Sequence, residues 1–140
     1  MIPDAIIALR AVVLADAGVA ALVGARVFGD ELPDIEAPNM PRYACVLSPA
    51  GGPPDHSYVP ISRQRIDVRA YGPTPLGAKK LHLAVHNVLK NLRRSVSLGT
   101  LIHSLTVESG PYALREPEAG AEWPLVFASY GLLVSEQSIA

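Results

Sequence analysis

Hydrophobic and polar positions change period along the chain, and each change marks an expected element. In residues 3–14, apolar side chains recur at intervals of three and four positions, which is typical of an amphipathic helix. Asp16 suits the N-cap of a second, short helix that runs to Val23, and Gly24 suits its end. The pattern therefore predicts two short N-terminal helices, followed by a brief extended piece over residues 25–28.

Two strands are expected next, separated by a turn-rich loop over residues 49–61 that is dense in proline and glycine. Residues 42–48 are apolar on both sides of the alternation, so both faces of this strand should be covered. Residues 62–71 alternate cleanly, with Ile66, Val68 and Ala70 on one side. The other side of the same strand carries four charged residues: Arg63, Arg65, Asp67 and Arg69.

The longest helical pattern follows this strand. Thr74 suits the N-cap and Pro75 the first helical position, where its missing N–H costs nothing. Basic residues near the expected end, at Arg94, suit the negative pole of the helix dipole. We therefore expect one long helix over residues 74–94. Its core stripe would hold Leu81, Val85, Val88, Leu89 and Leu92, and its basic end Lys90, Arg93 and Arg94.

Residues 101–109 and 125–134 are predicted to form two more strands, joined by a turn-rich link over 110–124. Strands thus come in consecutive pairs with one long helix between the pairs. This order favours an α+β fold. The expected sheet is mostly antiparallel, with about four strands, and the long helix and the short N-terminal helices pack on one face. The length of 140 residues predicts a single domain over 1–140.

Composition narrows the function. Hydrophobic residues make up 49% of the chain and mean hydropathy is +0.25, so we expect part of the surface to be buried in an assembly. No apolar run approaches the ~20 residues of a membrane span. Asp4, without a basic stretch before it, argues against a signal peptide. A net charge of −1 predicts no bulk attraction to nucleic acid. The single cysteine, Cys45, rules out an intrachain disulfide and suits the core.

The stretch "AYGPTPLGAKKLH" at residues 70–82 approaches a phosphate-binding loop. Such a loop needs lysine and a hydroxyl residue directly after its second glycine. Here Ala78 precedes Lys79, and Lys80 stands where the hydroxyl residue belongs. Its prolines also lack the N–H groups that would bind phosphate. The stretch is better interpreted as a capped strand-to-helix connection.

Histidines offer little further chemistry. His82 and His86 lie one helical turn apart, as in zinc proteases, but Leu83 replaces the glutamate that those enzymes place after the first histidine. We expect both to lie on a solvated helix flank, without metal. His56 and His103 have no evident acid or nucleophile partner. A Cys–His pair built on Cys45 stays open, although no nucleophile signature surrounds it. We therefore expect no catalytic, metal or cofactor residues, and we expect Trp123 to anchor a core or an interface.

The charged row Arg63, Arg65, Asp67 and Arg69 is the most directional feature of the sequence. One interpretation is a solvent-exposed sheet face, which antiparallel sheets commonly have. The other is an interface with an acidic partner, or a surface along which DNA passes. The negative charge of Asp67 and the net charge of the chain both argue against a surface along which DNA passes.

Four segments resemble the tail terminator, or tail-completion, family of long-tailed bacteriophages (siphophages), whose relatives occur in gene transfer agents and prophages. They are "LADAGVAALVGARVF" (14–28), "LPDIEAPNMPRY" (32–43), "RQRIDVRAYG" (63–72) and "PYALREPEAGAEWPLVFASYGLLV" (111–134). The resemblance covers nearly the whole chain in the right order. The family is defined by pattern and carries no catalytic signature.

The resemblance implies a structural virion protein, assembled in the host cytoplasm. Such proteins form a ring, usually a hexamer, at the head-proximal end of the tail tube. The ring ends tube polymerisation and meets the head-tail connector, while DNA passes through the channel without specific binding. No catalytic or cofactor residue carries over. Two alternatives stay open: a head-tail connector (stopper or adaptor) protein of the neck, and a small nucleotide-binding or metal-dependent enzyme using Lys79, Lys80, His82 or His86.

Overall fold

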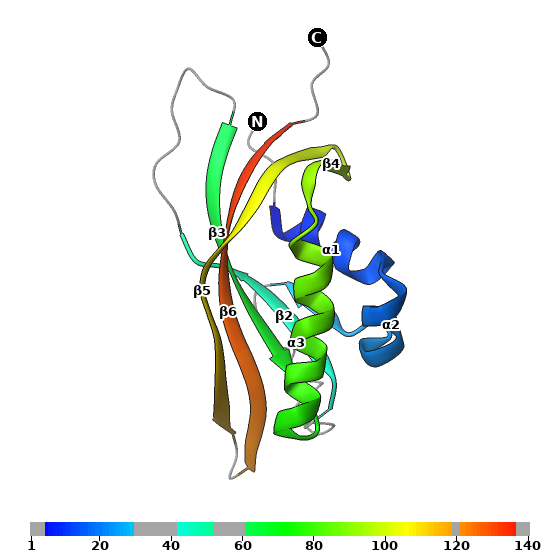
Figure 1. The fold of residues 1–140 in the computed structure, drawn as a ribbon, viewed down its shortest axis with the longest axis vertical. Helices are drawn as coiled ribbons and strands as arrows, with labels where there is room; N and C mark the ends of the chain where they lie inside the picture. The colour runs from blue at the N-terminus through cyan, green and yellow to red at the C-terminus, as the bar shows by residue number, and fades with distance from the viewer. Residues whose placement is uncertain (1–4, 30–41, 52–60, 119–120, 137–140) are drawn as a thin grey trace.

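A computed structural model describes residues 5–29, 42–51, 61–118 and 121–136. Within them lie three helices and six strands (Figure 1). The helices are α1 (Ala5–Ala15), α2 (Ala17–Val23) and α3 (Pro75–Leu89). The strands are β1 (Val27–Gly29), β2 (Ala44–Pro49), β3 (Ile61–Tyr71), β4 (Arg93–Ser97), β5 (Thr100–Glu118) and β6 (Ala121–Glu136).

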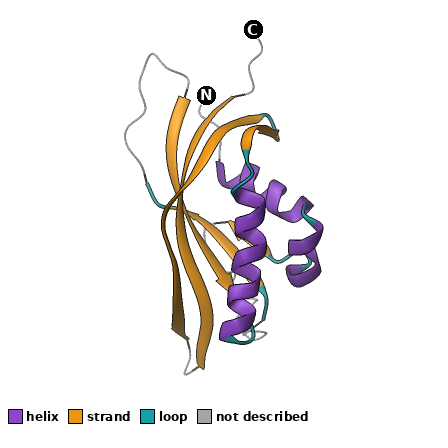
Figure 2. Ribbon diagram, viewed as in Figure 1, coloured by secondary structure: helices purple, strands orange, loops and turns teal. Residues whose placement is uncertain are grey.

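All six strands form one sheet in the order β1-β2-β3-β6-β5-β4. Every neighbouring pair is antiparallel except β1 and β2, which run parallel. The three helices pack on one face of this sheet (Figure 2). The predicted α+β class, the mostly antiparallel sheet and the one-sided helices are thus confirmed. The expected count of about four strands is wrong, because β1 and β4 flank the four central strands.

The long helix ends earlier than the sequence predicted. Helix α3 stops at Leu89 with Lys90 as its C-cap, so Arg93 and Arg94 lie in β4 and not at the helix terminus. A tight turn joins β4 to β5, with φ of 48° at Leu98 and 77° at Gly99. Positive φ at both central residues is what a two-residue hairpin of this twist requires. The hydroxyl of Ser97 also donates to the carbonyl of Ala8 in α1, at 2.9 Å, which fixes this edge strand.

The region expected to be a turn-rich link, residues 110–124, is instead mostly strand. It completes a long hairpin in which β5 and β6 pair from Thr100 opposite Glu136 to Glu118 opposite Ala121. Three register shifts in β5 absorb the local irregularity. Main-chain pairing along β6 thus outweighs the turn-forming tendency of the prolines and glycines in this stretch.

The main core lies between the helices and the sheet. Helix α1 contributes Leu9 and Val13, and α3 contributes Leu81, Val85 and Leu89. From the sheet come alternate residues of the central strands: Cys45, Leu47, Ile66, Val68, Ala70, Ala128, Tyr130, Leu132 and Val134. The burial of Cys45 is as predicted. No single helix among the described residues is long and apolar enough to cross a membrane; only α1 and α2 together, bent by 91°, meet that length and composition.

Both predicted helix caps are present. The carboxylate of Asp16 accepts a hydrogen bond from the amide of Val19 at 3.0 Å, and Gly24 ends α2 with φ of 60°. The hydroxyl oxygen of Thr74 accepts from the amide of Gly77 at 3.0 Å, with Pro75 in the first turn. The stretch that approached a phosphate loop is therefore a capped strand-to-helix connection, and its hydroxyl residue is used for the cap.

Thr74→Ala should lower the free energy of unfolding by about 1 kcal/mol, because an amide of the first turn of α3 loses its acceptor. Thr74→Ser keeps that oxygen and should leave stability nearly unchanged. Urea denaturation of both variants measures the difference. An equal loss in the two variants would contradict a capping role for the hydroxyl.

Candidate interaction surface

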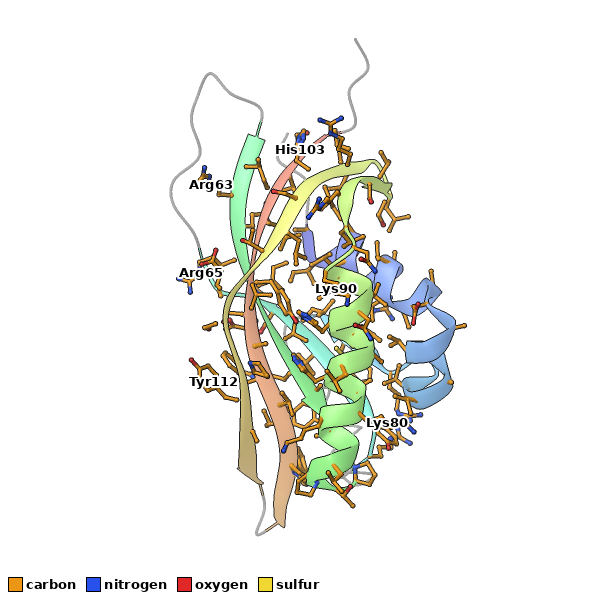
Figure 3. The ribbon with its side chains drawn as sticks, viewed as in Figure 1. Arg63, Arg65, Lys80, Lys90, His103 and Tyr112 are labelled. Carbon is orange, nitrogen blue, oxygen red and sulfur yellow. The ribbon has the colours of Figure 1, made fainter. Side chains whose placement is uncertain are left out.

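The face of the sheet opposite the helices carries the charged row predicted from the sequence. Because side chains alternate along β3, Ile66, Val68 and Ala70 lie in the core and the charged residues lie on the other side. Arg63 and Arg65 are exposed and point away from the helices (Figure 3). Asp67 and Arg69, further along the strand, are half-buried.

Asp67 is fixed to the sheet by a hydrogen bond. The hydroxyl of buried Ser129, directly opposite on β6, donates to the Asp67 carboxylate at 2.6 Å. In the part of the chain that the structure describes, neither Arg63 nor Arg65 forms an ion pair or a side-chain hydrogen bond. The two exposed guanidinium groups therefore keep their donors available for a partner.

A pocket of about 320 Å³ lies beside these two arginines. Gly131 on β6 pairs with Arg65 on one side and with Thr106 on the other, and its missing side chain makes room for Glu108 at the floor of the pocket. The Glu108 side chain lies over Gly131, in space that a Cβ there would occupy. Strands β3, β5 and β6 together supply the lining: Arg63, Gln64, Arg65, Ser104, Thr106, Glu108, Gly131, Leu132 and Leu133.

This lining determines what the pocket can bind. Two guanidinium groups favour a carboxylate, with which arginine forms charge-assisted and often bidentate hydrogen bonds. Leu133 adds an apolar wall, whereas the side chain of Leu132 lies in the main core. The carboxylate of Glu108 offsets part of the positive charge of the two arginines. The chemistry fits a peptide segment that combines acidic and aliphatic side chains.

The far end of the same face is covered by a second apolar cluster. Trp123 is 5% exposed and packs edge-on against Tyr71, with ring centroids 6.4 Å apart. Trp123 is thus a core anchor, one of the two roles predicted for it. The burial of both Ala44 and Cys45 confirms that β2 is covered on both sides. The cluster comprises Ala44, Val46, Tyr71, Trp123 and Leu125, with Phe28 and Phe127 packed against it.

The expectation that the helix histidines lie on a solvated flank is wrong for His82. This side chain is 6% exposed and its ring stacks on His86, with centroids 5.9 Å apart. The Nδ1 of His86 lies 3.1 Å from the Tyr130 hydroxyl. His82 follows Ala78 by four positions and precedes Val85 by three, so it lies within the buried stripe of α3. The helical period, applied to His82 itself, could have identified its burial.

Burial perturbs the titration of this region. Burial lowers the pKa of His82, and the nearby His86 lowers it further. The Nδ1 of His82 has no hydrogen-bond partner among the described residues, so nothing there stabilises a charged ring. Burial also raises the pKa of Cys45 to about 12 and that of Tyr130 to about 12, so both are protonated at neutral pH.

Other residues singled out from the sequence are dispersed. Lys79 and Lys80 are exposed on α3, and the side chain of Lys80 lies far from those of Arg63 and Arg65 (Figure 3). The Nε2 of His103 lies 2.8 Å from the Ser135 hydroxyl, a partner that the sequence did not reveal. His56 lies outside the described residues. Over the ranges that the structure covers, no three His, Cys, Asp or Glu side chains gather to hold a metal ion.

Stability should fall on acidification because His82 is buried in its neutral form. The unfolded chain binds a proton near the ordinary histidine pKa of about 6.5, whereas the folded chain binds it only at lower pH. The contribution of neutral His82 to the free energy of unfolding is therefore fully present above about pH 6.5. Between the pKa of the unfolded chain and the lowered pKa of the folded chain, it falls by about 1.4 kcal/mol per pH unit. Urea denaturation from pH 7.5 to 5 measures this slope.

His82→Phe should remove most of that slope while keeping an aromatic ring in the stripe. Since the variant can also change stability at neutral pH, the informative quantity is the slope and not the absolute free energy. An unchanged slope in the variant would show that another group causes the loss.

Among the described residues, the helices pack on one face of the sheet and the other face carries a charged surface with a pocket, which defines the class as an α+β protein. The model of the family described as "Tail completion protein gp17" matches residues 7–127. The chain belongs to this family. The resemblance noted in the sequence is thereby confirmed, and the chain is a structural protein of bacteriophage-like tails.

One solved structure supports the fold over nearly the whole chain. A chain of "Virion of native gene transfer agent (GTA) particle" superimposes with a TM-score of 0.62 at 20% sequence identity. The match covers 91% of this chain and 92% of that chain. At this identity the match establishes the shared fold. A comparison with curated proteins gives no match.

Proposed function

We propose that this protein forms a ring, usually of six copies in such assemblies, at the head-proximal end of the tail tube. The ring ends polymerisation of the tube protein and then presents a surface to the head-tail connector. Membership of the tail-completion family carries this proposal. The fold match to a chain of a gene transfer agent particle supports it, because that particle is also a virion-like assembly.

The open face of the sheet supports a role in assembly. Helices α1 to α3 cover one face, and on the other face the exposed side chains of Arg63 and Arg65 are accessible to other chains. Exposed guanidinium groups beside an apolar pocket are typical of interface residues, among which arginine is enriched. The row of Arg63, Arg65, Asp67 and Arg69 accordingly lies at a subunit boundary or faces the channel.

The charge balance of this face suits a channel through which DNA moves freely. Asp67 and Glu108 stand among the arginines, so the local positive charge is partly offset. The whole chain carries a net charge of −1. Strong phosphate binding needs many uncompensated cations, and its absence would let DNA pass without being held.

A head-tail connector protein, either stopper or adaptor, is the second candidate. The matching structure is of a whole particle, which supports a place in the virion without distinguishing the last tube ring from the neck above it. Electron microscopy of particles carrying a label on this chain separates the two. Density at the final tube ring supports the terminator, and density one layer higher supports the neck protein.

Purified protein should form closed rings that bind one end of isolated tail tubes. Mass measurement gives the copy number, and electron microscopy gives the symmetry and the position on the tube. A protein that stays monomeric and caps no tube would contradict the proposal.

Arg65→Glu should abolish ring formation while leaving the monomer folded, because Arg65 is exposed and its charge would face its partner with the wrong sign. Lys80→Glu is the matched control: the same charge change at an exposed site on α3, among the helices. Light scattering reports assembly and thermal denaturation reports folding. If Arg65→Glu assembles as wild type does, the row is only a solvated face.

A further inference from the structure

The pocket beside Arg63 and Arg65 selects a ligand by charge and by apolar contact. Its two exposed guanidinium groups have no ion-pair partner within the described residues, and the Glu108 side chain covers its floor at Gly131. Leu133 makes the neighbouring wall apolar. A segment that carries carboxylates with aliphatic side chains between them would satisfy both features.

One segment of this chain has that composition. Residues 30–36, "DELPDIE", hold four carboxylates and no cation, with Leu32 and Ile35 interleaved. The other glutamate-rich stretch, residues 116–122, "EPEAGAE", has three carboxylates but no large aliphatic side chain. Segment 30–36 therefore complements the pocket in both charge and apolar character.

The segment and the pocket belong to different parts of the subunit. The segment lies in residues 30–43, which connect edge strand β1 to β2. Ala44 pairs with Tyr71 of β3, and Gly29 pairs with Leu47 of β2, which in turn pairs with Val68. The pocket lies over β3, β6 and β5, towards the other end of β3. Two complementary surfaces at different places on one subunit make a head-to-tail contact, the kind that closes into a ring.

The length of the segment permits such a contact. Residues 30–41, held at both ends, project at most about 20 Å, half of their extended length. Tyr71, beside Ala44, lies six residues from Arg65, about 20 Å along the strand, so the pocket of the same copy lies at the limit of that projection. The experiment below therefore distinguishes binding to the next copy from binding within one copy.

We propose that the pocket of one copy binds the acidic segment 30–36 of the next copy, with Arg63 and Arg65 holding its carboxylates. This inference rests on the proposed ring and names the contact that closes it. The partner of the arginine row is therefore a second copy of this chain.

A charge-swap experiment in the full chain tests this contact. Variant A is Arg63→Glu with Arg65→Glu. Variant B replaces all four carboxylates of the segment by lysine: Asp30→Lys, Glu31→Lys, Asp34→Lys and Glu36→Lys. Each variant alone sets like charges against each other and should form no rings. In an equal mixture, every A pocket meets a B segment of opposite charge and every B pocket meets an A segment. The mixture should therefore form rings that contain both variants, measured by mass and by electron microscopy.

The outcomes separate this inference from the proposed ring. Wild-type rings together with a mixture that fails to assemble would overturn the inference and leave the proposed function standing. So would assembly of variant A alone. A single chain with all six substitutions that assembles, while the mixture does not, would show that the segment acts within its own subunit, which also overturns the proposal.

A peptide titration tests whether the pocket binds the acidic segment, even if the wild-type chain forms no rings. The probe is a synthetic peptide of residues 29–37, and the control is a peptide of residues 116–122. The first should bind the wild-type chain and lose on the order of tenfold in affinity against Arg65→Glu, as loss of one charge-assisted pair implies. Lys80→Glu should bind it as wild type does. Equal binding of both peptides, or no binding of the first, would overturn the inference.

Discussion

The pairing of β3 with β6 organises this molecule. Eleven consecutive residue pairs, from Ile61 opposite Ser135 to Tyr71 opposite Leu125, hold the two strands in one register at the centre of the sheet. Because side chains alternate across a strand, this register places Ile66 and Val68 under the helices and the arginines on the other face. A shift of one residue would expose the core and bury the charges, so the register fixes the fold and the interaction surface together.

The same constraint gives the two faces of the sheet different roles. One face is saturated by α1, α2 and α3, whose apolar stripes fill the main core. The other face is divided along its length, with an apolar cluster around Tyr71 and Trp123 at one end and the arginine pocket at the other. The face packed against the helices thus stabilises the fold, and the opposite face presents the side chains that can contact other chains.

Local patterns predicted much of this arrangement. The caps at Asp16 and Thr74, the helix and strand types and the charged row on β3 follow from spacing within a few residues. Strand β4 and the long hairpin of β5 and β6 could not be predicted from local spacing, because they depend on pairing between residues far apart in sequence. Arg93 and Arg94 fit a helix end as well as a strand, and residues 110–124 are rich in turn formers. Only the partner strands decide between these conformations.

The pocket could not be predicted for the same reason. Arg65, Thr106 and Gly131 come from three strands, and neither Gly131 nor Glu108 carries a local signal of its position beside the arginines. His82 differs, because its place in the helical period indicates burial whereas its polarity favours solvent, and in the structure the helical period prevails.

The buried thiol has a practical consequence. Cys45 is the only cysteine of the chain, it is fully enclosed, and its pKa is raised to about 12. Thiol-directed dyes and gold clusters react with thiolates, so they would leave the native chain unmodified. A cysteine introduced at any exposed position would then be the sole reactive handle, and each bound fluorophore would report one chosen point of one subunit inside an intact particle.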